Sequence, residues 1–414
     1  MITYFSMEGF LSVKKKVELY FVPKPHTRIT NTRFEDNFIH TPKYKLMKAA
    51  VLFGMNASGK SNVLLGMEQL ISMINRGLNL GAVDDMRRNL INFDCKTVAF
   101  EIGLYDVKSD QDYVYQIAYD CEKIVSEKLV LNGQEIFSFS DGKLSITNLS
   151  GIKERDALIR LFSGVSTELY LLKLKDYMGE YITSFQKLAA AVKTNIRDIV
   201  PMLDRDNIRV VNEERKGFWE NNKKRILSVF HMLDGTITDI GFEKIQADRY
   251  EVLIFRGKKK YHLGIESKGI QKICHLMDVL ITNMINGEVL AVDELDSSIS
   301  TGSLIELFND LINTKENKGQ FIITSHNPFL MNQNIFHPQQ LYIVNKKSDL
   351  SSEIYSFDDF DIIFPFLSNK MHLELVVPWS SAIIYLPITP PDLLSKKPCS
   401  KGRAFIKTYI LVNL

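Results

Sequence analysis

Short apolar runs alternate with helical patterns in two parts of the chain, and this alternation predicts a parallel sheet. Residues 61–75 carry Leu64, Leu65, Met67, Leu70, Ile71 and Ile74 at helical spacing, and Gln271–Ile285 is a second apolar helix. Buried strands alternating with helices are typical of an α/β sheet covered by helices. The predicted buried strands are Lys48–Phe53, Val289–Asp293, Phe321–Thr324 and Leu341–Val344.

A different pattern, alternation with a period of two, predicts antiparallel strands elsewhere in the first 140 residues. The chain begins with two such strands, Ile2–Phe5 and Val17–Phe21. A longer group forms a predicted β meander, in which Asn132-Gly133 is a tight-turn signal. Its strands are Val98–Tyr105, Tyr113–Tyr119, Ile124–Leu131 and Glu135–Phe139.

The segment from Lys153 to Asp234 is predicted to be mainly helical, and none of its helices is long enough for an extended coiled-coil arm. The helical stretches are Ala157–Phe162, Tyr181–Thr194 and Arg225–Leu233. Trp219 is predicted to be a packing anchor. After this segment, Tyr250–Phe255 and Tyr261–Gly264 form a predicted hairpin with a basic tip. The tip is interpreted as a solvated end, with DNA contact as the alternative.

Composition places the chain among globular proteins able to bury a core. Of the 414 residues, 45% are hydrophobic and 24% charged, and the net charge of +2 neither favours nor excludes nucleic acid. The four cysteines have neither zinc-site spacing nor the density of a disulfide scaffold, which favours a reducing cytoplasm. No run of about 20 apolar residues is present, so no membrane span is expected.

The stretch Gly54–Ser61 fits the pattern Gly-x-x-x-x-Gly-Lys-Ser/Thr at every fixed position, between a predicted strand and a predicted helix. Its glycines allow the backbone N–H groups to wrap a phosphate chain, and the helix N-terminus favours negative charge. Lys60 would reach the β- and γ-phosphates, and Ser61 would ligate Mg²⁺. The context disfavours a chance glycine-rich turn. Residues 22–46 are predicted to form a loop over this nucleotide region.

A second group of residues follows the buried strand at 289–292. Asp293 would hold Mg²⁺ at the carboxyl edge of the sheet, and Glu294 would polarise the attacking water. Asp293 follows Lys60 by 233 positions (293 − 60). Small GTPases and kinases place these elements much closer, whereas ABC- and SMC-type ATPase heads carry a large insertion.

Three further segments resemble motifs of such heads and occur in the expected order. Ser267-Lys268-Gly269 resembles a degenerate ABC signature, Leu295-Asp296-Ser297 resembles the D-loop, and Thr324–Pro328 contains a switch-type histidine, His326. Each segment alone has an ordinary alternative, such as a helix cap for Ser267 or Asp296 and a strand-end histidine for His326. Their combined order favours the ATPase interpretation.

On these motifs, residues 1–362 resemble ATP-binding proteins with an AAA-type core of ABC/SMC-like architecture. The relatives include the ATPase half of the OLD nucleases and the stand-alone Rlo-type ATPases of abortive-infection operons. The resemblance implies a P-loop head with a mixed central sheet, helices on both faces, an inserted β meander and a helical lobe. The expected units are 1–95 (first part of the head), 96–150 (meander), 151–248 (helical lobe), 249–362 (second part of the head) and 363–414 (atypical tail).

The resemblance also implies the site. It assigns hydrolysis to Lys60, Glu294 and His326, and Mg²⁺ to Ser61 and Asp293. ATP would be bound by Gly54, Asn56, Ala57, Ser58, Gly59, Lys60, Ser61 and Asn62, with Ser267 and Gly269 serving the nucleotide of a partner subunit. Two departures stand out. The zone 90–97 lacks the glutamine that helps hold Mg²⁺ in ABC heads, leaving Asn92 or Asp94 as substitutes. The tail from Phe364 is apolar and proline-rich, and a frameshifted end is favoured over a divergent tail or a β appendage.

The expected function is therefore that of a cytoplasmic ATPase switch. ATP would close a head-to-tail homodimer, or a higher oligomer, that controls a separate effector, such as a nuclease, in anti-phage defence or DNA surveillance. Asp359 and Asp361 form an Asp-x-Asp pair without a matching nuclease glutamate, so they are interpreted as turn residues. The alternatives are an SMC-like DNA-repair head and an ATP-dependent scaffold without significant turnover.

Overall fold

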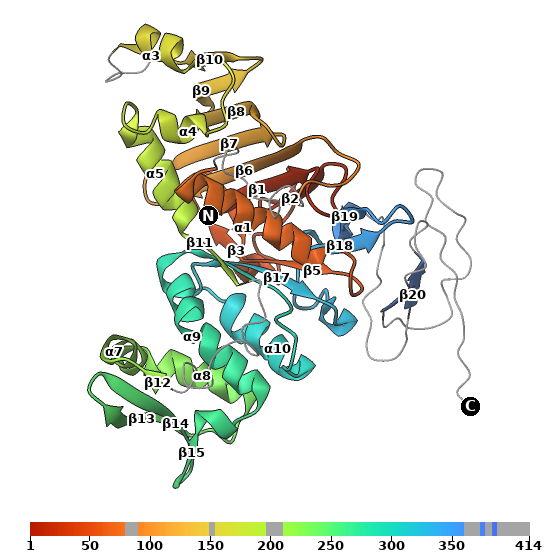
Figure 1. Cartoon of the computed structure of the whole chain (residues 1–414). Coiled ribbons are helices and arrows are strands. Elements are labelled where there is room, and N and C mark those ends of the chain that lie inside the picture. Colours follow the sequence, from red (N-terminus) through yellow and green to blue (C-terminus); the bar gives the residue numbers. More distant parts are fainter. Residues whose placement is uncertain (79–89, 149–153, 196–209, 360–372, 377–382, 387–414) are drawn as a thin grey trace, which may run out of the picture.

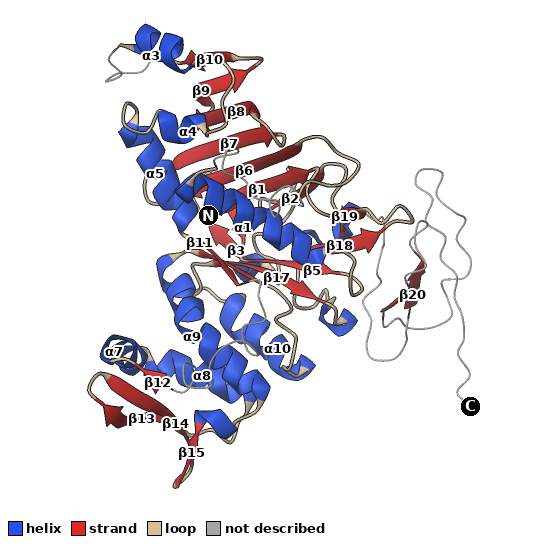
Figure 2. Ribbon diagram, viewed as in Figure 1, coloured by secondary structure: helices blue, strands red, loops and turns tan. Residues whose placement is uncertain are grey.

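In the computed structural model, a central sheet lies between an antiparallel β lobe and a lobe of helices and short strands (Figure 1). The structure describes residues 1–78, 90–148, 154–195, 210–359, 373–376 and 383–386. Helices α1 (Lys60–Arg76) and α9 (Lys268–Asn286) cover opposite sides of the central sheet (Figure 2). This arrangement is the predicted α/β architecture.

Within the described residues, the central sheet has six strands. Every neighbouring pair is parallel except the last, which is antiparallel, so the sheet is mixed. In spatial order the strands are β11 (Val192–Asn195), β16 (Val289–Val292), β17 (Gln320–Ser325), β5 (Ala49–Phe53), β18 (Leu341–Lys346) and β19 (Ser352–Ser356).

One edge of this sheet corrects a sequence prediction. The helix predicted over Tyr181–Thr194 ends at Ala190, because α5 spans Gly179–Ala190. Val192–Asn195 instead pairs with Val289–Val292 as a parallel edge strand. A four-residue segment is too short for periodicity to separate it from the end of a helix. Its β-branched Val192 and Thr194 favour the extended form, and the available sheet edge stabilises it.

Successive residues of the central strands enter two different hydrophobic cores. In β5, Ala50 and Leu52 belong to the core shared with the β lobe, whereas Ala49, Val51 and Phe53 belong to the core shared with the second lobe. Side chains alternate between the faces of a strand, so a strand covered on both faces must be apolar at every position. This explains the unbroken apolar run that precedes the glycine-rich loop.

The β lobe contains a seven-stranded antiparallel sheet. In spatial order its strands are β10 (Lys143–Ile146), β9 (Gln134–Ser140), β8 (Ile124–Leu131), β7 (Gln111–Tyr119), β6 (Val98–Asp106), β1 (Ile2–Glu8) and β2 (Val17–Tyr20). Helices α1, α3 (Arg155–Phe162), α4 (Tyr170–Lys173) and α5 contribute to its core. The predicted meander is therefore present, extended by the two N-terminal strands and by β10.

The second lobe packs helices against a small antiparallel sheet. Its strands are β12 (Val210–Val211), β14 (Arg249–Arg256), β13 (Asp239–Gln246) and β15 (Lys259–His262). Its helices are α7 (Glu213–Asn221), α8 (Lys223–Leu233), α9 and α10 (Thr301–Leu307), the last continued by a π-helical turn over Phe308–Ile312. Trp219 is fully buried here and donates to Asp278, which agrees with its predicted role.

The segment that the sequence analysis treats as one helical lobe contributes to both cores. Buried residues of α3, α4 and α5 pack with the β lobe, whereas those of α7 and α8 pack with α9. Composition alone gives no sign of this division, since both halves carry similar helical spacing.

Residues 22–46 are not placed over the phosphate loop. They include the hairpin β3 (Phe38–His40) and β4 (Lys45–Met47), which precedes β5. Asn37 binds Gln340 (Nδ2–Oε1 2.8 Å), whose Nε2 donates to Ala49 O at 3.0 Å. These residues therefore lie at the amino end of β5, opposite the glycine-rich loop at its carboxyl end. Proline content predicted a loop but carried no information about which sheet edge it covers.

The tail is described only over β20 (Leu373–Val376) and β21 (Ile383–Leu386), which pair antiparallel. The rest of the tail, with Asp361 of the predicted Asp-x-Asp pair, lies outside the described residues. Asp359 accepts hydrogen bonds from Lys24 Nζ at 3.1 Å and from Ser356 N at 3.1 Å. Among the helices that the structure describes, none is long and apolar enough to cross a bilayer.

Candidate nucleotide-binding site

The glycine-rich loop connects β5 to α1, as the sequence predicts. Lys60, at the start of α1, is 4% exposed, and its Nζ donates to Gly54 O at 2.8 Å and to Met55 O at 3.0 Å. Ala57 (φ 63°) and Gly59 (φ 105°) both adopt left-handed backbone conformations. The loop therefore curls around the amine. No described side chain caps the N-terminus of α1, so its first N–H groups are not used by a cap.

A close contact with β18 at position 54 and the left-handed backbone at position 59 account for the two fixed glycines of the pattern. A Cβ at Gly54 would lie 2.3 Å from Val344 O, and one at Gly59 would lie 2.1 Å from Ser352 Oγ. Ser352 Oγ donates to Ser58 O at 2.7 Å. The loop is thus held from outside by a strand that follows it by nearly 300 residues.

Ser12 also supports the loop, and the sequence analysis missed it together with Ser352. Asn62 Nδ2 and Ser352 Oγ lie 2.6 and 2.8 Å from Ser12 Oγ, and Ser352 N donates to Ser12 O at 2.7 Å. Asn62, predicted as a nucleotide ligand, therefore uses its side-chain amide to hold the N-terminal loop. No local motif marks Ser12 or Ser352, because only the fold brings them together.

At the carboxyl end of β16, one threonine organises both predicted acids. Thr324 Oγ1 donates to Asp293 Oδ1 at 2.5 Å and accepts from Glu294 N at 2.7 Å. Thr324 lies on the adjacent β17 and is fully buried. Glu294 has φ 46°, an uncommon conformation for a residue other than glycine. The two acids therefore end β16 in a defined geometry beside the glycine-rich loop.

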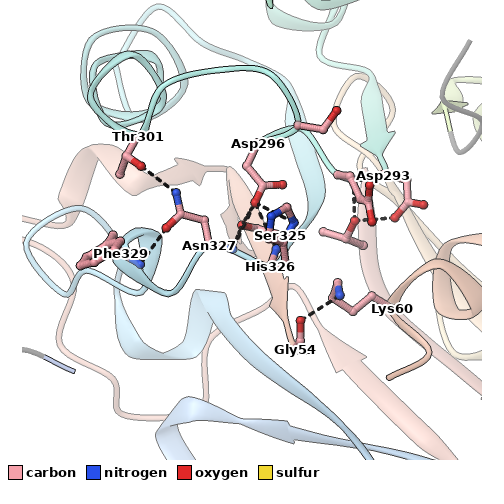
Figure 3. Close-up of polar contacts among 12 residues, drawn as sticks. Gly54, Lys60, Asp293, Asp296, Thr301, Ser325, His326, Asn327 and Phe329 are labelled. Carbon is pink, nitrogen blue, oxygen red and sulfur yellow. Dashed lines mark hydrogen bonds and ion pairs between the residues drawn. The ribbon is translucent and has the colours of Figure 1, made fainter. Parts of the chain in front are cut away.

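The charges of these acids act on the pKa of Lys60. Burial lowers the pKa of the Lys60 amine below its ordinary value of 10.5, and the charges of Glu294, Asp293 and Asp296 oppose this shift. The Lys60 amine is held by two carbonyls of its own loop and can donate to an anion bound in that loop. Figure 3 shows Lys60, Asp293, Asp296 and His326 in one region at the ends of β5, β16 and β17.

Asp296 holds the segment that contains His326, and the sequence analysis did not foresee this. Its Oδ2 accepts from Ser325 Oγ at 2.7 Å and from the N–H groups of His326 and Asn327 at 3.1 Å (Figure 3). His326 Nδ1 lies 3.4 Å from the same oxygen, and its side chain is 49% exposed. Asp296 does not cap the following helix, because Ser300 accepts from Ser303 N there.

The predicted signature segment begins α9. Ser267 Oγ accepts from Ile270 N at 3.3 Å, so the helix-cap alternative describes its contact in this structure. A Cβ at Gly269 would lie 2.3 Å from Ser298 O. Lys272, one turn further along α9, donates to Glu294 O at 2.6 Å. The start of α9 is therefore packed against the loop that follows Glu294.

The two candidates for the missing glutamine are engaged in other contacts. Asn92 Nδ2 donates to Leu11 O at 2.6 Å, and Asn92 Oδ1 accepts from Asp94 N at 3.0 Å. Asp94 Oδ2 binds Lys14 Nζ at 2.7 Å. Both side chains thus stabilise the loop that contains Ser12, and neither contact involves Lys60 or Asp293.

The residues present fit a nucleotide triphosphate with Mg²⁺. Ser58 Oγ is buried without a hydrogen-bond partner among the described residues, and its hydroxyl can donate to a phosphate oxygen. The hydroxyl of Ser61 and the carboxylate of Asp293 are oxygen donors of the kind that Mg²⁺ prefers. Within the described residues, no group of three or more His, Cys, Asp or Glu side chains forms a self-sufficient metal site.

The fold and this site define the class of the protein as a P-loop ATPase-type domain with ABC/SMC-head architecture. The family model described as "AAA domain, putative AbiEii toxin, Type IV TA system" matches residues 49–332, more than half of the chain. The chain belongs to this family of AAA domains. A search of curated proteins found no match.

Solved structures of SMC heads are similar to this chain in fold. An SMC head bound to the C-terminal winged-helix domain of ScpA has a TM-score of 0.50 and 15% identity, covering 86% of this chain and 96% of that chain. The SMC head domain from Thermotoga maritima has a TM-score of 0.41 and 14% identity, with coverages of 86% and 98%. At such identities the likeness concerns the fold alone.

Proposed function

We propose that the protein binds ATP with Mg²⁺ and hydrolyses it to ADP and phosphate. The observation that carries the proposal is that three separate segments meet at the carboxyl ends of neighbouring strands: the glycine-rich loop after β5, the acids after β16 and the His326 segment after β17. In open α/β sheets, ligands bind outside the carboxyl ends of the strands, where these segments meet.

Each residue has a role that follows from its chemistry. Lys60 and the N–H groups of residues 56–62 bind the β- and γ-phosphates. Ser61 and Asp293 would hold Mg²⁺, which would neutralise phosphate charge there. Glu294 accepts a proton from the attacking water, and His326 donates to the γ-phosphate. Thr324 fixes the orientation of Asp293 and the backbone of Glu294.

The second part of the proposal is a switch made by two copies of the chain. Ser267 and Gly269 of one copy close over the ATP bound to the other, giving a head-to-tail homodimer, and the same contacts could extend to a higher oligomer. Loss of the γ-phosphate removes the bridge and separates the copies. ATP shifts the equilibrium between separate copies and the closed dimer because it binds the closed dimer more tightly.

The biological role that we propose is control of a separate effector, such as a nuclease, in abortive infection or anti-phage defence. The description of the matching family, a putative AbiEii toxin, is consistent with this role. The longest described helix, α9, has 19 residues, so the described part contains no extended arm for mechanical work on DNA.

The basic hairpin does not add a strong argument for DNA. Arg256 binds Asp234 and Glu266, and Lys260 binds Glu243. Two of the five tip residues, 256–260, are thus neutralised by neighbouring carboxylates, which favours the interpretation of a solvated, structural hairpin. The proposal therefore does not depend on DNA as a partner.

The test compares three variants for ATP binding, hydrolysis and mass in solution. Lys60→Ala is expected to abolish ATP binding. Glu294→Gln is expected to bind Mg-ATP and to hydrolyse it at a rate lower by about 100-fold or more. Its mass in solution is expected to double when Mg-ATP is added, as a dimer forms. Glu288→Gln, an acid at the opposite end of β16, is the matched control. Unchanged ATP binding by Lys60→Ala would refute the site, and an unchanged mass of Glu294→Gln would refute the dimer.

A further inference from the structure

A buried lysine joins the start of α9 to the loop that carries the proposed catalytic acid. Lys272 is 7% exposed, and its Nζ donates to Glu294 O at 2.6 Å and to Ser297 Oγ at 3.0 Å, with Ser297 O at 3.5 Å. Burying an amine is costly unless it is well hydrogen-bonded. A methionine or leucine at this position would fill a similar space without the cost of burying an amine. The contacts of Lys272 must therefore offset that cost.

The backbone that Lys272 contacts is strained. Glu294 has φ 46°, and such a conformation costs of order 1 kcal/mol or more for a residue with a side chain. Three hydrogen bonds hold it. Glu294 N donates to Thr324 Oγ1 at 2.7 Å, and Glu294 O accepts from Ser297 N at 2.9 Å and from Lys272 Nζ. Of the three residues that make these hydrogen bonds to Glu294, Lys272 is the one on α9.

A second contact ties the same helix to the same loop. Gly269 lies so close to Ser298 that a Cβ would be 2.3 Å from Ser298 O. Gly269 and Lys272 are three residues apart, so they lie on one face of α9. The first two turns of α9 therefore contact residues 294–298 at two points, a hydrogen bond from Lys272 and a close approach at Gly269.

We infer that Lys272 is a positioning residue that fixes Glu294 relative to α9, so that contact of a nucleotide with Ser267 is communicated to Glu294 of the same chain. This inference rests on the proposed function for its consequence in hydrolysis. Its structural part, the restraint of the Glu294 backbone by Lys272, does not depend on ATP at all.

The experiment replaces Lys272 with methionine, which has similar length and no donor. Lys48→Met is the matched control. Lys48 is 3% exposed and donates to the backbone carbonyl of Thr314 at the amino end of β5, far from Glu294 in the sheet. Lys272→Arg tests rescue by a side chain that keeps charge and donors. Hydrogen exchange of the peptide spanning 290–298 is measured without nucleotide, and kcat, KM and ATP affinity are measured with Mg-ATP.

In Lys272→Met, exchange of the Glu294 and Ser297 amides is expected to accelerate by about tenfold or more. The kcat is expected to fall by about 10- to 100-fold, with ATP affinity within about twofold of the parent because Lys60 is untouched. Lys272→Arg is expected to regain most of the lost rate. Lys48→Met is expected to change neither the 290–298 exchange nor kcat.

Two results would overturn the inference: unchanged exchange at 290–298 in Lys272→Met, or an equal loss of kcat in Lys48→Met. Failure of the proposed function gives a different pattern. If the parent protein does not hydrolyse ATP while Lys272→Met still loosens residues 294–297, the restraint stands and the ATPase assignment falls.

Discussion

Replacement of Gly269 by alanine is expected to destabilise the protein, although alanine is normally the better helix residue. Gly269 is in the first turn of α9, where a Cβ would lie 2.3 Å from Ser298 O, 3.3 Å from Ser298 C and 3.6 Å from Ile299 Cγ1. The first of these atoms is backbone, so rotation of a side chain cannot relieve the overlap. Either α9 or the 294–298 loop must move by about 1 Å to restore ordinary contact.

The magnitude follows from two opposing effects. Overpacking of this kind costs about 1–3 kcal/mol, whereas replacing a helical glycine by alanine gains about 1 kcal/mol. The expected net result is a loss of up to about 2 kcal/mol in the free energy of unfolding.

Gly217 provides a matched control of opposite sign. It is also helical, in α7, and a Cβ there would meet no atom within 4 Å. Gly217→Ala is therefore expected to stabilise the protein by about 0.5–1 kcal/mol. Gly66, in α1, is an intermediate case, because its nearest atom is the flexible Met7 Sδ at 2.4 Å.

Urea unfolding of the three alanine variants measures this series. The expected order of stability is Gly217→Ala above the parent, then Gly66→Ala, with Gly269→Ala lowest. Equal stabilisation by Gly269→Ala and Gly217→Ala would show that α9 does not approach Ser298 as described. The attachment of α9 to the Glu294 loop would then lose one of its two contacts.

Three further outcomes are expected. Burial raises the pKa of Glu127 from 4.5 to about 7, so its contribution to stability is present below pH 4.5 and is lost as pH rises to about 7. The free energy of unfolding in urea should therefore fall over this pH range by at most about 3 kcal/mol. This fall should be absent in Glu127→Gln and retained in the control Glu101→Gln. Trp219→Phe removes the indole donor to Asp278 and should lower the free energy of unfolding by about 1–3 kcal/mol, with a smaller loss in a Trp219→Phe/Asp278→Asn double variant than the two single losses added together. Asp296→Ala removes the acceptor for two backbone N–H groups of the His326 segment, so hydrogen exchange of residues 325–327 should accelerate by about tenfold, and unchanged exchange would contradict the anchoring role.

Local sequence patterns were sufficient for those elements whose determinants are close together in the chain. The strand Ala49–Phe53 is apolar at every position because both of its faces are covered. The glycine-rich loop and α1 follow it without interruption, so one continuous stretch specifies the binding loop. The acids at 293 and 294 likewise follow directly from a strand that ends at the carboxyl edge of the sheet.

Patterns failed where the determinant is a partner far away in the chain. Val192–Asn195 became a strand because β16 offers an edge, and residues 22–46 pack at the amino end of β5 because Asn37 meets Gln340 there. Neither outcome is encoded in the periodicity of the segment concerned. Local spacing describes which faces are apolar and carries no information about what covers them.

The sequence by itself determined the chemistry of this protein: a lysine in a glycine-rich loop, two acids after a buried strand, and a histidine after the next one. Tertiary structure alone decided how that chemistry is held. Ser12 and Ser352 brace the loop, Thr324 orients both acids, Asp296 anchors the His326 segment, and Lys272 restrains Glu294. These supports are hydrogen bonds between groups that only folding brings within reach, so the spacing of residues in the sequence does not predict them.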